Sequence, residues 1–141
     1  MDMEKLKKIL AELGCANATY DEIEMLVEAA LPKKEIQSHL IILAIHLVKV
    51  EIYGRTTASW KNSISNSVIE IHDYNSRNPK KASYYYNFDF MKSLLAAKWD
   101  QVLTKVANES NDQFTIKALK KEVKFDDIWI KIEKALGHRY Q

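Results

Sequence analysis

Residues 36–53 read IQSHLIILAIHLVKVEIY, and this stretch decides the fold. At 3.6 residues per turn, its apolar side chains lie nearly all the way round a helix. A helix of that composition belongs in the middle of a bundle, because other segments must cover its faces. We therefore predict a central helix over about 33–53. Its strongly polar residues are Gln37, Ser38, His39, His46, Lys49 and Glu51.

The segments on either side show the apolar periodicity of amphipathic helices joined by short turns. Gly54 ends the central helix, and Thr56 or Thr57 can cap the next one. Upstream, Thr19-Tyr20-Asp21-Glu22 matches a capping box, in which the Thr19 hydroxyl accepts a hydrogen bond from the amide of Glu22. Residues 75–81, NSRNPKK, combine turn formers with charge and predict a loop. The predicted helices cover about 3–13, 20–31, 58–74, 84–109, 114–123 and 126–136.

Composition also favours helices. The chain has 141 residues but only three glycines and two prolines, whereas all-β folds need many turns. A chain of this length can bury a real core within one domain. We predict an all-α fold, a single-domain helical bundle of five to seven helices around the central apolar helix, with the domain spanning 1–141.

Charge and cysteine content say little about partners. The net charge is +2, divided into −2 for residues 1–70 and +4 for residues 71–141, which falls short of the dense basic face of a nucleic-acid binder. Cys15 is the only cysteine, so no intramolecular disulfide is possible. The first ten residues hold no apolar stretch long enough for a signal peptide. The longest uninterrupted apolar run is Leu40–Ile45, far short of a membrane span of about 20 residues. We expect a cytoplasmic protein without membrane association.

A polar stripe runs along the central helix through Glu35, His39, His46, Lys49 and Tyr53. A histidine beside a lysine in apolar surroundings could have a shifted pKa and act in acid–base catalysis, which would make an enzyme centred on His46. We prefer a structural interpretation, in which the stripe is the single solvent-exposed edge of the helix or His46 is hydrogen-bonded to a neighbouring helix. No partnered nucleophile accompanies the histidine.

Metal and cofactor sites are not expected. His39 and His46 are seven residues apart, about 10 Å along a helix, which is too far for one tetrahedral ion. His72 or His138 could join them only through the tertiary fold. No glycine-rich phosphate loop and no G-x-S-x-G motif is present. These absences disfavour an enzyme.

Two basic groups give weak support for nucleic-acid binding. One precedes a run of tyrosines on which bases could stack, and the other can share a helix face. The preferred interpretation is structural: the tyrosines begin a helix and pack partly inward, and the lysines keep the chain soluble. The residues are Arg77, Lys80 and Lys81 before Tyr84 and Tyr85, and then Lys117, Lys120, Lys121 and Lys124.

Protein partnership is the remaining class. Three tryptophans and seven tyrosines exceed what a core of this size needs, and surplus aromatics at a surface favour interfaces. Self-association through the aromatic segment Tyr84–Phe90 is one form of this hypothesis.

The chain also resembles a known family. His46-Leu47-Val48-Lys49, followed by Arg55 and then Ser59-Trp60, is similar to the H-L-L-K stretch, basic turn and S-W pair of the bacterial domain-of-unknown-function family 29. The resemblance covers Thr19–Tyr74 and departs from the family at Val50, where an aromatic is usual. It implies a bacterial, all-helical, soluble domain without an established activity, and it supplies no catalytic residue.

The matched motif has a physical reading of its own. If the turn at Gly54 folds the next helix back, Trp60 can reach the central helix near His46 and Lys49, where a cation–π contact or an indole hydrogen bond would brace the corner. We therefore interpret His46, Lys49, Ser59 and Trp60 as a structural motif. The predicted function is a non-enzymatic protein-interaction module, with a nucleic-acid-associated protein as the alternative and an enzyme centred on His46 as the third reading.

Overall fold

In the computed structural model, residues 4–5, 8, 12, 19–24 and 31–141 are described. The chain divides into two compact units, Met1–Pro32 and Lys33–Gln141. Within the first unit, residues 20–24 are helical, and the Thr19 hydroxyl accepts a hydrogen bond from the amide of Glu22 at 3.2 Å. This contact confirms that half of the predicted capping box. The helix predicted over 3–13 and the rest of the helix predicted over 20–31 lie outside the described residues.

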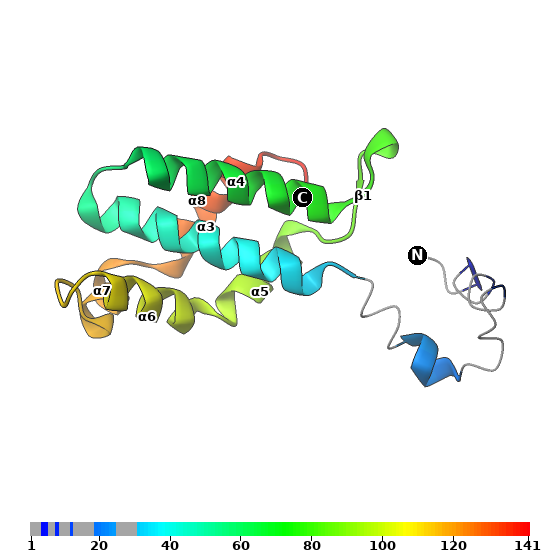
Figure 1. Cartoon of the computed structure of the whole chain (residues 1–141), viewed down its shortest axis with the longest axis horizontal. Helices are drawn as coiled ribbons and strands as arrows, with labels where there is room; N and C mark the ends of the chain where they lie inside the picture. The colour runs from blue at the N-terminus through cyan, green and yellow to red at the C-terminus, as the bar shows by residue number, and fades with distance from the viewer. Residues whose placement is uncertain (1–3, 6–7, 9–11, 13–18, 25–30) are drawn as a thin grey trace. The chain divides into compact units, whose positions relative to one another are not determined.

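The second unit is helical apart from one small hairpin. Figure 1 shows α4, α3 and the pair α5–α6 side by side, and α3 contacts α4, α5, α6 and α8. The all-α class and the central helix are confirmed, while the extent of one domain over 1–141 stays a prediction. In the range 31–141 the elements are α3 (Lys33–Tyr53), α4 (Ala58–Asn75), β1 (Ser76–Asn78), a 3-10 turn (Pro79–Lys81), β2 (Ser83–Tyr84), α5 (Phe88–Ala96), α6 (Trp99–Glu109), α7 (Ile116–Glu122) and α8 (Phe125–Leu136).

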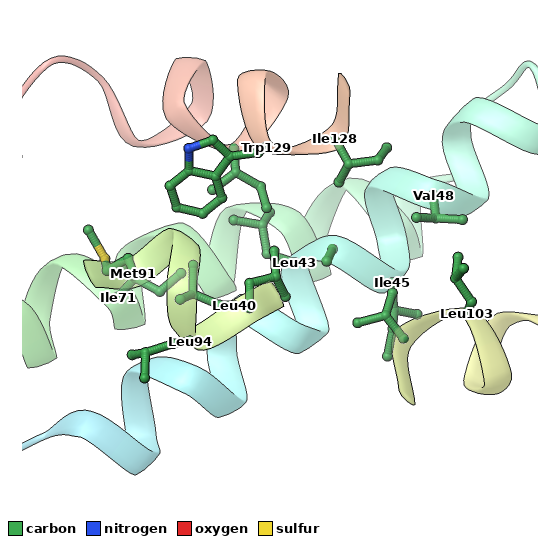
Figure 2. Close-up of a cluster of buried hydrophobic side chains, with 14 of the residues drawn as sticks. Leu40, Leu43, Ile45, Val48, Ile71, Met91, Leu94, Leu103, Ile128 and Trp129 are labelled. Carbon is green, nitrogen blue, oxygen red and sulfur yellow. The ribbon is translucent and has the colours of Figure 1, made fainter. Parts of the chain in front are cut away.

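The core is built on the buried side of α3. Figure 2 shows the buried side chains of α3 meeting side chains of three other helices. These are Ile71 of α4, Met91 and Leu94 of α5, and Ile128 and Trp129 of α8. Removing each large apolar side chain from water stabilises the fold by about 1.5–3 kcal/mol. The buried residues of α3 are Ile36, Leu40, Leu43, Ala44, Ile45 and Val48.

Not every face of α3 is covered, however. Glu35 and Ser38 are exposed, Ile42 is 39% exposed, and His46 and Lys49 are half-buried. These positions recur every three or four residues and therefore form one strip along the helix. The expectation of a helix enclosed almost all the way round is wrong for this strip. It shares Glu35, His46 and Lys49 with the predicted polar stripe, but Ser38 and Ile42 are exposed where His39 and Tyr53 were expected.

The corner between α3 and α4 follows from local chemistry. The amide of Gly54 donates to Val50 and its φ is +63°, a left-handed conformation that glycine adopts without steric cost. Thr57 then caps α4, its hydroxyl accepting from the amide of Trp60 at 3.1 Å. The helix predicted over 58–74 is confirmed and runs one residue further, to Asn75.

Two predictions for the middle of the chain need correction. The loop predicted over 75–81 contains a short antiparallel hairpin, in which Ser76 pairs with Tyr84 and Asn78 with Ser83. The helix predicted over 84–109 is two helices, α5 and α6, separated at residues 97–98. Tyr84 belongs to the hairpin instead, and the side chain of Asn87 begins α5 by accepting from the amide of Phe90. The break lets the apolar faces of α5 and α6 both pack against α3.

From residue 110 onward, the structure agrees better with the elements that the sequence pattern predicts. The predicted break at residues 110–112 coincides with left-handed backbone at Asn111 and Asp112. Helices predicted over 114–123 and 126–136 are found as α7 and α8, and Gly137 ends α8 with φ +78°.

Asn75 gives a direct test of how the hairpin is held. This fully buried residue donates to the carbonyl of Tyr86 and accepts from its amide, both at 2.9 Å. Asn75→Ala removes both bonds in a buried place, so we expect it to lower the free energy of unfolding by about 2–3 kcal/mol. Urea denaturation of this variant and of Asn66→Ala, an exposed asparagine on the same helix, makes the comparison. Equal stability of the two variants would contradict the role given to Asn75.

Candidate functional site

The motif corner brings together part of the predicted group. The ammonium of Lys49 lies 6.0 Å from the centre of the Trp60 ring, and Trp60 also contacts Tyr53, with 5.6 Å between ring centres. The guanidinium of Arg55 lies over Trp60 at 5.7 Å. On its other side, Lys49 forms an ion pair with Glu109 of α6. The predicted cation–π contact is confirmed, and Lys49 joins α4 to α6 across the exposed strip of α3.

His46 and Ser59 do not take part in this network. The Nδ1 atom of His46 is hydrogen-bonded to the carbonyl of Ile42 in its own helix at 2.8 Å. No ring contact or hydrogen bond links His46 to Trp60 within residues 31–141, and Ser59 is exposed. His46 lines neither of the two pockets described below. The arrangement thus gives Lys49 and Trp60 a bracing contact, and within residues 31–141 the ring of His46 is hydrogen-bonded to its own helix and to no nucleophilic side chain.

The hairpin presents the first basic group to solvent. Arg77, Lys80 and Lys81 are all exposed, and Tyr85 beside them is 37% exposed. Tyr84 differs, since it is half-buried and its hydroxyl donates to the carbonyl of Gln141 at 3.0 Å. The cations and Tyr85 therefore remain available to a ligand, whereas Tyr84 already holds the end of the described chain.

The lysines of the second basic group are also exposed but lie elsewhere. Figure 1 shows α7 and the hairpin at opposite ends of this unit. Lys120 forms an ion pair with Asp100 at 3.4 Å, which offsets part of the local charge. The two groups therefore do not make one surface. The exposed members near α7 are Lys117, Lys120, Lys121 and Lys124.

An aromatic ladder, defined as Tyr85, Tyr86 and Phe90, follows the hairpin. Tyr86 and Phe90 are stacked with ring centres 4.5 Å apart, and Tyr85 lies 6.4 Å from Tyr86. Tyr85 and Phe90 are each 37% exposed. The segment Tyr84–Phe90 was a predicted contact surface, and the structure shows which of its rings reach solvent.

A pocket of about 610 Å³ opens beside the hairpin. No sequence pattern groups its charged and aromatic residues, because they come from distant segments of the chain. His72 and Tyr140 are 68 positions apart, yet their Nδ1 and hydroxyl are hydrogen-bonded at 2.5 Å. A smaller pocket of about 310 Å³ shares Tyr140 with it. The larger pocket is lined by His72, Asp73, Ser76, Ala82, Ser83, Tyr84, Arg139 and Tyr140.

Burial and one cation set the electrostatics of this pocket. Burial lowers the pKa of His72, and Arg139 lowers it further, while Asp73 opposes the shift. Burial raises the pKa of the Tyr140 hydroxyl, against a smaller lowering by Arg139. His72 is therefore neutral and Tyr140 protonated at neutral pH.

The expectations of no metal site and no membrane association stay predictions. Among the described residues, no three His, Cys, Asp or Glu side chains gather as a metal-binding group. By length and composition alone, α3 is apolar enough to span a membrane, a test that a core helix also passes. In this structure α3 packs against four helices.

No protein family, curated protein or solved structure matches the chain in the comparisons made. The resemblance to the bacterial family stays an expectation.

The ion pair at the corner has a pH signature. A hydrogen bond from Lys49 lowers the pKa of Glu109, Lys105 acts in the same direction, and burial opposes them. The stability from this carboxylate is therefore present above its unfolded pKa and is lost as pH falls through the lower folded pKa. We expect Lys49→Met to lower the free energy of unfolding by about 1 kcal/mol at pH 7, and less at about pH 3.

Lys105→Met supplies the matched control, because Lys105 also pairs with Glu109 but its side chain is 60% exposed against 16% for Lys49. Urea denaturation at both pH values should show a smaller loss for this variant. A larger loss for Lys105→Met, or a Lys49→Met effect that does not shrink in acid, would contradict the bracing role.

Proposed function

We propose that the unit Lys33–Gln141 is a non-enzymatic protein-interaction module that uses the aromatic ladder as its contact surface. The observation that carries this proposal is the exposure of Tyr85 and Phe90 on either side of Tyr86. Aromatic rings that lose little entropy on binding are the side chains most enriched at protein interfaces and at their energetic centres.

The ladder is also held in place before any partner arrives. Asn75 fixes the backbone of Tyr86 by two hydrogen bonds, and Asn87 fixes that of Phe90 by one. A contact surface that is ordered in the free protein avoids part of the entropic cost of association. This rigidity supports a binding role over that of an ordinary surface loop.

An enzyme centred on His46 has less support. His46 is bonded to its own helix and does not line the described pockets. General acid–base catalysis requires the histidine to reach a substrate or a partnered nucleophile, directly or through one water.

Nucleic-acid association is the second candidate, and the hairpin favours it. Arg77, Lys80 and Lys81 are exposed next to Tyr85, which places cations beside a ring on which a base could stack. The support is weaker because the lysines around α7 lie at the other end of the unit and cannot extend the same basic surface.

Origin and family are proposals of the same kind. The contact between Lys49 and Trp60 gives the family-like motif a structural reason, which supports membership of the bacterial family. We propose a cytoplasmic location because Cys15 is the one cysteine of this sequence and has no second cysteine to pair with.

The experiment removes the ladder while keeping the fold. Tyr85→Ser with Phe90→Ser deletes both exposed rings, and the control Ile69→Ser with Ile130→Ser deletes two apolar side chains that are 54% and 51% exposed elsewhere. Light scattering at high concentration detects self-association, and capture from a nuclease-treated lysate of the native cell detects other partners. The ladder variant should bind at least about 30-fold more weakly, and the control should bind normally.

Three outcomes would contradict the proposal. One is a 16.4 kDa monomer that captures nothing, and another is equal binding by both variants. The third is capture that nuclease abolishes and that Lys80→Gln with Lys81→Gln weakens, which would favour the nucleic-acid candidate.

A further inference from the structure

The pocket beside the hairpin has a floor of aromatic rings. Tyr140 is 4% exposed and lies at the centre, with its ring 5.5 Å from His72, 5.1 Å from Tyr84 and 5.6 Å from Phe88. Its backbone is fixed as well, because its carbonyl accepts from the amide of Phe88 at 2.7 Å. Tyr84 meets Tyr140 edge to face and the ring of His72 is tilted by 45°, while Phe88 supports Tyr140 from outside the lining. An aromatic ligand ring can pack against such a floor edge to face or in an offset stack.

The rim carries hydrogen-bond donors that have no partner among residues 31–141. Within residues 31–141, Arg139 makes no hydrogen bond or ion pair, and the hydroxyls of Ser76 and Ser83 make no hydrogen bond. Asp73 is the one acidic side chain of the lining. The guanidinium of Arg139 lowers the pKa of His72 more than Asp73 raises it, so a cation acts on this side of the pocket.

We propose that this pocket binds a small planar anion, an aromatic ring bearing one carboxylate or phosphate group. The ring lies on the floor formed by His72, Tyr84 and Tyr140. The guanidinium of Arg139 holds the anionic group in a charge-assisted pair, and the hydroxyls of Ser76 and Ser83 supply further donors.

Size and position agree with this assignment. Pockets for small ligands typically measure about 300–1,000 Å³ and combine apolar walls with a few convergent polar groups. The volume of about 610 Å³ falls in this range. None of the ladder residues lines the pocket, so the inference does not depend on the proposed interaction function.

The test is an NMR titration of the protein with four probes at fixed salt. Phenyl phosphate and benzoate carry both a ring and an anion, phenol carries only the ring, and inorganic phosphate carries only the anion. At least one of the first two should shift the signals of His72, Tyr84 and Tyr140 with saturation, and should bind more tightly than both phenol and inorganic phosphate. Comparing phenyl phosphate with benzoate then identifies the preferred anion.

Variants separate the pocket from general surface charge. Arg139→Gln should weaken binding at least about tenfold, since it removes the charged partner, and Lys134→Gln on the exposed side of α8 should leave binding unchanged. Ser83→Phe should block binding by filling the pocket without changing the charge. The inference is overturned if no ring-bearing anion binds, if phenol or inorganic phosphate binds as tightly, or if Arg139→Gln binds like the wild type.

Discussion

The buried side of α3 is the constraint on which the rest of this unit depends. Leu40, Leu43 and Val48 are fully buried, and α4, α5, α6 and α8 each place apolar side chains against this helix. A helix of twelve residues or fewer, such as α5, α6 or α8, is marginal in water by itself. Their stability comes from the face they bury against α3, so the unit has one core and no independent part among these helices.

Polar contacts then fix the relative positions of helices that apolar packing alone does not determine. Lys49 links α4 and α6 across the uncovered strip of α3, and Asn75 ties the start of the α5 segment to the end of α4. Buried or half-buried polar groups specify position because leaving them unpaired is costly. Both candidate sites lie near Asn75: the aromatic ladder continues from it, and the hairpin that borders the pocket begins beside it.

Local chemistry explains which parts of this structure the sequence predicts. Gly54 and Thr57 mark their own corner, and the apolar run before them marks α3, because a left-handed glycine, a capping hydroxyl and a helical period act over a few residues. The hairpin has strands of only two or three residues, too short for an alternating pattern to show. The break between α5 and α6, at residues 97–98, contains no glycine or proline from which it could be predicted. It depends instead on the packing of both helices against α3.

The candidate sites also differ in whether the sequence predicts them. The sequence groups Lys49 with Trp60 and points to the rings of Tyr84–Phe90, since those residues are close along the chain or across one turn. It does not find the pocket, whose residues His72 and Tyr140 meet only after α4 and the segment following α8 are packed together. It also names the hairpin cations and the lysines around α7 as two supports for one function, and the structure places them at opposite ends of the unit.

Native-state hydrogen exchange tests the organising role of α3 most directly. If its buried side holds the unit together, the amides of Leu40, Ala44 and Val48 exchange only through global unfolding, with an opening free energy equal to the free energy of unfolding. The flanking helices should open at or below that value. Exchange of these three amides through a smaller opening, while α5, α6 or α8 stays protected, would contradict the account.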